Sequence, residues 1–184
     1  EYGRSIWNSR AHVQGHISYD MAIWKLWKPV IAQVHGYALA GASTLALACD
    51  LTIMADDAKI GYPPNRWLAT GDNIGIYSFL AGLKIAREMS YGRCLTGVEA
   101  TQCGLVNRHF PEAQIEEETY KIAAQIAEID PQLLMGIRTA MEVSGEFDSL
   151  CHMSDTGQRL REAIVRRNSL SEGLREVNAP WGGI

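Results

Sequence analysis

The residues best suited to chemistry lie in one stretch of the chain, from Lys28 to Asp50. Residues 30–34 are a short apolar run after a proline, which predicts a strand buried on both faces. The small residues of 36–41 predict a sharp turn that another group can approach closely, and the Ala- and Leu-rich residues 42–49 predict a buried helix. A strand, a glycine turn and a helix N-terminus together leave backbone N–H groups where an anionic oxygen can bind. The alternative is that the small residues only allow the helix to pack tightly.

The elements that must position this stretch lie on both sides of it. Apolar residues at helical spacing predict a helix over residues 15–27, which ends at Lys28-Pro29. Residues 50–55 and 59–61 predict two more short strands. Adjacent prolines exclude regular structure over residues 62–67. Asp72 then has the position of an N-cap for a helix over residues 74–81, and a second helix follows over residues 83–91.

The rest of the chain is predicted to be mainly helical. Thr96 and Glu99 have the spacing of a capping box and predict a short helix that ends at Gly104, followed by a strand at residues 105–106. Asp130 and Pro131 have the pattern of a helix start. Helices are predicted over residues 112–128, 131–143, 147–167 and 172–177. The fold class is therefore α/β, with a core over residues 1–110 and a helical C-terminal region over residues 111–184.

Composition excludes several classes of function. The chain has 184 residues, of which 47% are hydrophobic and 21% charged, as in an ordinary globular domain. A net charge of −4 offers no basic surface, so a nucleic-acid partner is not expected. No apolar run reaches the roughly 18 to 20 residues that span a bilayer, so no membrane partner is expected. Cys49, Cys94, Cys103 and Cys151 are scattered, which predicts reduced thiols in a cytoplasmic protein and no metal site.

Several segments, in their order along the chain, resemble the enoyl-CoA hydratase/isomerase (crotonase) superfamily. The matching segments are residues 28–41, 45–51, 57–61 and 104–111, and residues 174–182 are similar to the family's C-terminal segment. The resemblance covers nearly the whole chain. It implies a crotonase-like spiral of ββα turns followed by a helical trimerisation region, with trimers that often pair into hexamers. It also implies an acyl-CoA substrate, with coenzyme A as part of that substrate and no other cofactor.

The resemblance assigns one of the family's two oxyanion donors to the backbone N–H of Gly41. Enolate formation at a thioester builds negative charge on the carbonyl oxygen, and losing one such donor costs roughly 3 to 4 kcal/mol. The family's N-terminal part carries the first donor and much of the adenine pocket. Since the sequence begins at Glu1, that part is expected to have no counterpart here.

Two positions depart from the family's pattern. The hydratases of the family have one catalytic glutamate where this chain has Thr44, and the other in the segment that contains Pro64. Neither residue can do the acid/base work of a carboxylate, so hydration by that mechanism is not expected. The usual glycine cluster is also thinned, with Ala40 and Ala42 on either side of Gly41.

Other candidate residues follow from the same resemblance. Asp72 lies in the loop where dienoyl-CoA isomerases and a haloaryl-CoA dehalogenase place an active-site aspartate, which implies a base or a nucleophile. The N-cap role is the alternative for Asp72. Tyr62 and Trp67 either line an acyl pocket or belong to the core. The candidate substrate-binding residues are Ala40, Thr44, Tyr62, Pro64 and Trp67.

Two interpretations of function remain open. The first is an enzyme that acts on an acyl-CoA through an enolate stabilised at Gly41, by isomerisation, decarboxylation or hydrolysis. The second is a non-catalytic relative that serves as a trimeric scaffold or binds CoA esters. Near the site, His35 is expected to be a core or interface histidine and Tyr37 to pack behind the turn.

Overall fold

The computed structural model describes residues 18–63 and 75–143. Its elements are β1 (Ile31–Val34), β2 (Tyr37–Leu39), α2 (Gly41–Leu47), β3 (Leu51–Ala55), β4 (Lys59–Gly61), α4 (Ile76–Ser90), β5 (Cys94–Thr96), α5 (Gly97–Gln102), β6 (Arg108–Phe110), α6 (Glu112–Ala127) and α7 (Pro131–Val143). Residues 18–24 are also helical, within the helix predicted over residues 15–27. The helices predicted over residues 147–167 and 172–177 lie outside the described residues, as do Pro64, Trp67 and Asp72.

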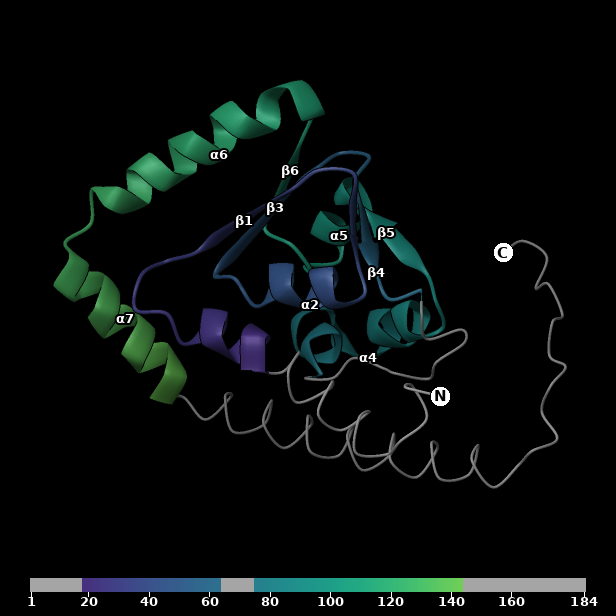
Figure 1. Ribbon diagram of the computed structural model, residues 1–184, viewed down its shortest axis with the longest axis horizontal. Helices are drawn as coiled ribbons and strands as arrows, with labels where there is room; N and C mark the ends of the chain where they lie inside the picture. Colours follow the sequence, from purple (N-terminus) through teal and green to yellow (C-terminus); the bar gives the residue numbers. More distant parts are fainter. Residues whose placement is uncertain (1–17, 64–74, 144–184) are drawn as a thin grey trace, which may run out of the picture.

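The strands form two small sheets that share a repeated ββα arrangement (Figure 1). In the first sheet, β3 lies between β1 and β6 and is parallel to both. In the second, β4 lies between a parallel β2 and an antiparallel β5. The chain therefore passes from one sheet to the other in β1-β2-α2 and again in β3-β4-α4. Each passage is one turn of a ββα spiral.

Several predicted elements are confirmed with their physical causes. The two helices predicted around Gly82 are the halves of α4, because Gly82 has a φ of 76° and a ψ of 167°, which break the helix there. The capping box at α5 is complete, since Thr96 and Glu99 each accept the other's backbone N–H. Asp130 caps α7 by accepting the N–H groups of Gln132 and Leu133.

Three sequence-based predictions of strands and turns are wrong. Residues 36–41 are not one turn, because they contain β2, which pairs with β4. Residues 105–106 form no strand, because both amides donate to the carbonyl oxygen of Ala100 in the turn after α5. The strand that completes the first sheet is instead β6, further along the chain. β5, in the second sheet, was not predicted. β1 is also less buried than expected, since Val34 is its only fully buried residue.

The hydrophobic core joins both sheets to the helices that cover them. Its fully buried members come from β3, β4, α4, β5 and α6 and include Ile53, Met54, Ile60, Ile76, Tyr77, Met89, Leu95 and Ile115. α7 begins just beyond the C-terminal end of α6 (Figure 1). Arg138 of α7 donates to the Asp50 carboxylate and to the carbonyl oxygen of Trp24. These bonds connect α7 to the segment that carries α2 and β3.

Candidate functional site

The candidate site lies where β2 passes into α2. The amide of Ala40 donates to the carbonyl oxygen of Gly61 over 2.9 Å and so continues the pairing of β2 with β4. Ala40 then reverses the chain with a φ of 56° and a ψ of −127°, and it is the one non-glycine residue with positive φ in the described part of the chain. Such a conformation costs of order 1–3 kcal/mol and persists only where the surroundings hold it.

This reversal leaves two amides of α2 without a partner among the described residues. The N–H groups of Ser43 and Thr44 donate to the carbonyl oxygen of Ala40, over 3.0 and 3.4 Å. Among the described residues, nothing accepts from the N–H groups of Gly41 and Ala42. No acidic side chain lies in the first turn of α2 to compete for them. Unpaired amides in this position attract an anionic oxygen.

Thr44 is fixed behind these amides. Its hydroxyl donates to the carbonyl oxygen of Gly41 over 3.0 Å, and the residue is only 1% exposed. This internal bond uses the hydroxyl proton of Thr44, and a hydroxyl cannot exchange protons as a carboxylate does near neutral pH. Thr44 therefore supports the backbone of the site and supplies no acid or base.

Ser43 and Tyr77 form a buried polar connection that the sequence did not reveal. The Ser43 hydroxyl donates to the carbonyl oxygen of Ala40 over 2.6 Å and also bonds the phenolic oxygen of Tyr77. Both side chains are 0% exposed. The partners lie 34 residues apart, on α2 and α4, so no local pattern could have found them.

Of the other candidate residues, only Tyr62 lies within the described structure, directly after Gly61, whose carbonyl oxygen accepts from Ala40. Tyr62 follows β4 directly and lies in the hydrophobic core, 7% exposed. Pro64, Trp67 and Asp72 lie outside the described residues. Tyr37 is 76% exposed, so the prediction that it packs behind the turn is wrong. His35 is also exposed, and it bonds Gln33 rather than core residues.

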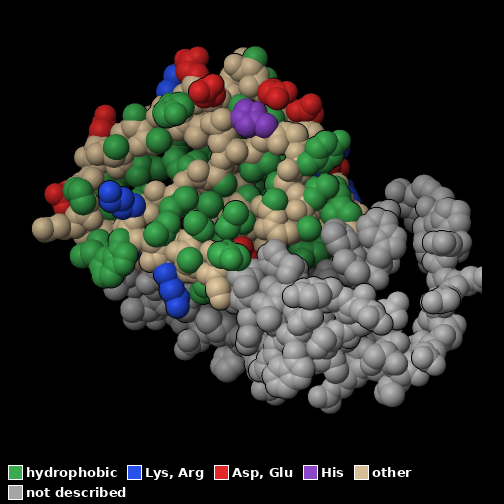
Figure 2. Space-filling model, viewed as in Figure 1, with side chains coloured by type: hydrophobic (Ala, Val, Ile, Leu, Met, Phe, Trp, Pro, Cys, Tyr) green, Lys and Arg blue, Asp and Glu red, His purple; other side chains and the backbone are tan. Residues whose placement is uncertain are grey.

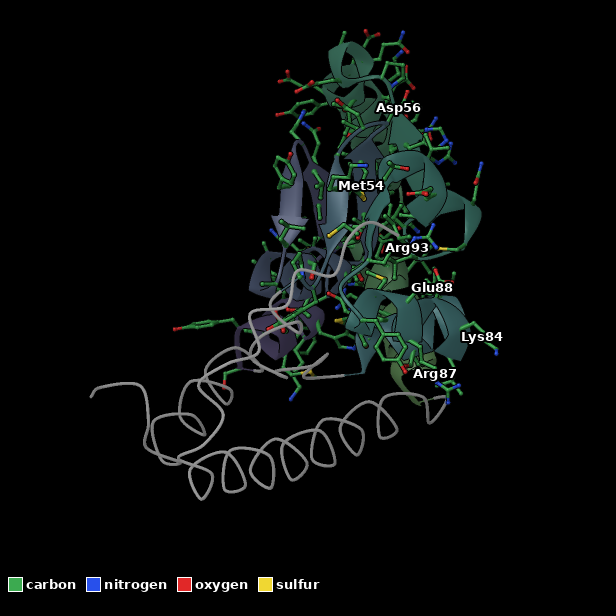
Figure 3. The ribbon with its side chains drawn as sticks, turned by 90° about the vertical axis from the view of Figure 1, so that its right-hand side faces the viewer. Met54, Asp56, Lys84, Arg87, Glu88 and Arg93 are labelled. Atoms are coloured by element: carbon green, nitrogen blue, oxygen red, sulfur yellow. The ribbon has the colours of Figure 1, made fainter. Side chains whose placement is uncertain are left out.

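A second polar pair connects the end of β3 to β6. Asp56 follows β3, and its carboxylate is hydrogen-bonded to Nδ1 of His109 over 2.7 Å. Figure 3 places Asp56 at the opposite end of the molecule from Lys84 and Arg87 of α4. The pair joins the turn after β3 to β6, and its printed hydrogen bond is to no residue of the β2–α2 junction.

Cys49, just after α2, is not an activated thiol. Burial raises the pKa of the Cys49 thiol, and the Asp50 carboxylate raises it further, so the thiol stays protonated near neutral pH. No group of three His, Cys, Asp or Glu side chains within the described residues is arranged to hold a metal ion. None of the described helices combines the length and the apolar character that crossing a membrane requires.

Two ββα turns wound through a pair of sheets place the chain among the α/β spiral proteins. A family model described as Enoyl-CoA hydratase/isomerase matches residues 9–181. The chain therefore belongs to the enoyl-CoA hydratase/isomerase family, and it has the crotonase-like α/β fold.

Solved structures of similar proteins agree with this assignment. An enoyl-CoA hydratase/isomerase from Xanthobacter autotrophicus Py2 is 30% identical, with a TM-score of 0.80 over 87% of this chain and 60% of its own. A probable enoyl-CoA hydratase from Mycobacterium smegmatis is 25% identical, with a TM-score of 0.82 over 91% of this chain and 69% of its own. An enoyl-CoA hydratase from the same organism shares the fold at 24% identity, with a TM-score of 0.79 over 88% of this chain and 55% of its own. The chain spans less than two thirds of the first and third of these proteins.

Proposed function

We propose that the protein acts on an acyl-CoA thioester and stabilises an enolate oxygen with the backbone N–H of Gly41. The observation that carries the proposal is this amide, to which no described residue offers an acceptor, in a chain of the enoyl-CoA hydratase/isomerase family. Removing a proton next to a thioester moves negative charge onto its carbonyl oxygen. A preorganised amide stabilises that charge by roughly 3 to 4 kcal/mol.

The proposed reaction is isomerisation, decarboxylation or hydrolysis rather than hydration. The hydratases that this chain resembles use two catalytic glutamates, and this chain has Thr44 and Pro64 at the matching positions. Thr44 is buried and bonded to Gly41, which supports its exclusion as an acid or base. In this proposal Asp72 is the base or nucleophile, and coenzyme A enters only as part of the substrate. Ala40, Tyr62 and Trp67 then belong to the substrate's surroundings.

The loss of both glutamates also favours a second candidate function. A non-catalytic member of the family would keep the fold and bind CoA esters or serve as a scaffold without turning them over. Thermal unfolding distinguishes a scaffold that binds no thioester from an enzyme that binds acyl-CoA. A ligand at a hundredfold excess over its Kd stabilises the folded protein by about 2.7 kcal/mol. A scaffold that binds no thioester shows no shift with any acyl-CoA.

We further propose that the chain assembles as a homotrimer, or as a hexamer of paired trimers. Hydrophobic side chains cover much of the face seen in Figure 2, between α6 and α7 on one side and β4 and β5 on the other. On α7, Leu133 is 63% exposed and Ile137 is 54% exposed, and they lie one helical turn apart. Burial of this apolar surface in an assembly is favourable.

Solvent deuterium incorporation at the α-carbon of a panel of acyl-CoAs tests the enzyme directly. Exchange reports enolate formation without knowledge of the final product, and mass spectrometry detects it. Gly41→Val is expected to lower the exchange rate by a hundredfold or more, since its side chain blocks the amide. Ala113→Val, at an exposed position of α6 away from the proposed α7 interface, is the matched control and should exchange at the wild-type rate. Unchanged exchange in Gly41→Val would remove Gly41 from the mechanism.

The same assay places Asp72 in the reaction or excludes it. Asp72→Asn abolishes exchange if Asp72 is the base, with little change in the unfolding temperature. Retained exchange together with a lowered unfolding temperature would support the N-cap role instead. Absence of exchange in the wild type with every thioester would favour the non-catalytic candidate.

A further inference from the structure

We propose that Tyr77 and Ser43 are positioning residues that orient and polarise the Gly41 amide, an inference that rests on the function proposed above. Ser43 comes from α2 and Tyr77 from α4, and the two side chains share a hydrogen bond inside the core. Their position behind the peptide that joins Ala40 to Gly41 gives them a role in the site without contact to a substrate.

The donors and acceptors of these two hydrogen bonds can be assigned in one direction only. The carbonyl oxygen of Ala40 is an acceptor, so Ser43 must give its single hydroxyl proton to that bond, over 2.6 Å. The Ser43 oxygen can then only accept from the phenolic hydroxyl of Tyr77. The relay therefore runs from Tyr77 through Ser43 to Ala40.

Holding the Ala40 oxygen also fixes the direction of the Gly41 N–H. The two groups belong to one planar trans peptide and point in opposite directions. The φ of 56° at Ala40 is a conformation that side-chain-bearing residues rarely adopt, so the peptide needs external support to stay there. The backbone amides of Ser43 and Thr44 give part of that support, and the Ser43 hydroxyl adds the shortest of the three bonds.

The relay also changes the strength of the amide as a donor. Hydrogen bonds arranged in a chain polarise one another, most of all where water is excluded. Electron density drawn to the Ala40 oxygen leaves the N–H of the same peptide more positive. A more positive N–H stabilises an enolate oxygen more than it stabilises the less charged thioester oxygen, so the effect belongs to the transition state.

Removing single oxygen atoms tests the relay. Tyr77→Phe deletes the phenolic hydroxyl and keeps the buried ring, and Ser43→Ala deletes the central hydroxyl. Tyr77→Phe is expected to lower α-proton exchange about tenfold, less than the roughly hundredfold loss for an oxyanion donor removed outright. The Kd for the acyl-CoA should change less than about twofold, since the relay acts on the transition state. Tyr120→Phe, on α6 and 69% exposed, is the matched control with wild-type rate.

Combining the variants separates a relay from two independent packing effects. Because both residues act through the bond to Ala40, the Ser43→Ala, Tyr77→Phe double variant should lose no more than Ser43→Ala alone. Losses that multiply in the double variant, or a weakened Kd with an unchanged exchange rate, would overturn the inference.

The amide signal of Gly41 tests the relay without any turnover. In protein labelled with 15N-glycine, Tyr77→Phe and Ser43→Ala should each shift the Gly41 amide resonance and leave that of Gly136 in place. Gly41→Ala identifies the resonance by its loss. If the wild type exchanges no α-proton, the proposed function fails, and this spectrum still decides the relay. A Gly41 resonance that stays unmoved in both variants refutes it.

Discussion

Gly97 is a position in the described part of the chain where a missing Cβ atom matters for packing. It is the first residue of α5 and lies against the end of β3. A Cβ at this position would lie 3.0 Å from the carbonyl carbon of Ala55 and 3.1 Å from the Cβ of Met54, with the Ala55 oxygen closer still. Ala55 and Met54 are both fully buried, so neither can move aside without disturbing the core.

Gly97→Ala is therefore expected to lower the free energy of unfolding by about 3 kcal/mol, the upper part of the range for overpacked cores. Urea denaturation measures the change. Gly136→Ala is the control, because a Cβ there meets nothing and alanine favours the helix by roughly 0.5 to 1 kcal/mol. A Gly97→Ala protein as stable as the wild type would show that α5 can shift away from β3 at little cost.

Residue environments were predictable only where neighbours in the sequence determine them. Thr96 and Glu99 lie three residues apart, so their capping box could be predicted from spacing alone. The environment of Tyr37 could not, because its 76% exposure depends on which face of β2 packs on the core. The bonds of Tyr77 to Ser43 and of His109 to Asp56 span 34 and 53 residues, and only the folded chain brings those partners together.

At the scale of elements, α5 shows how a cap becomes sensitive to pH. The backbone N–H of Thr96 donates to the Glu99 carboxylate over 2.8 Å and lowers the pKa of that carboxyl below its ordinary value of 4.5. Arg93 also donates to this carboxylate, over 3.1 Å, and favours its charged form. A depressed folded-state pKa adds stability above pH 4.5, and that stability is lost as the pH falls through the lower, folded-state value.

Glu99→Gln should therefore be less stable than the wild type at pH 7, and the difference should shrink as the pH falls below 4.5. Thermal unfolding at a series of pH values measures this difference. Glu116→Gln, on the exposed part of α6, is the control and should follow the wild type across the series. A stability difference independent of pH would mean that the carboxylate charge contributes nothing to the cap.

Elements with a strong local signal were predictable, and those defined by pairing were not. β3, β4, α6 and the break in α4 each have a run, a period or a glycine that marks them. β2 and β5 have three residues each, and they are strands only because β4 lies between them. Leu105 and Val106 are apolar because they are buried in a turn, which a strand pattern cannot distinguish.

At the scale of the whole molecule, α7 connects the fold to the proposed assembly. Its Arg138 bonds the Asp50 carboxylate, which also accepts the N–H of Val30, so one face of the helix is attached to the β1 and β3 segment. Leu133 and Ile137 are exposed on the same helix. Because the two side chains lie one helical turn apart, they are the residues of α7 that the proposed assembly would bury.

The proposed trimer predicts a sedimentation mass three times the 20.3 kDa of the chain, or six times for a hexamer. Ile137→Glu places a charge in the apolar stripe, and burying an unpaired charge costs enough to dissociate the assembly. Tyr91→Glu, at an exposed site after α4, is the control and should keep the wild-type mass. A wild-type monomer at micromolar concentration would count against the trimer, whereas an intact trimer in Ile137→Glu would move its interface away from α7. Measuring α-proton exchange on the dissociated Ile137→Glu protein then tells whether the Gly41 site works within one chain or depends on the assembly.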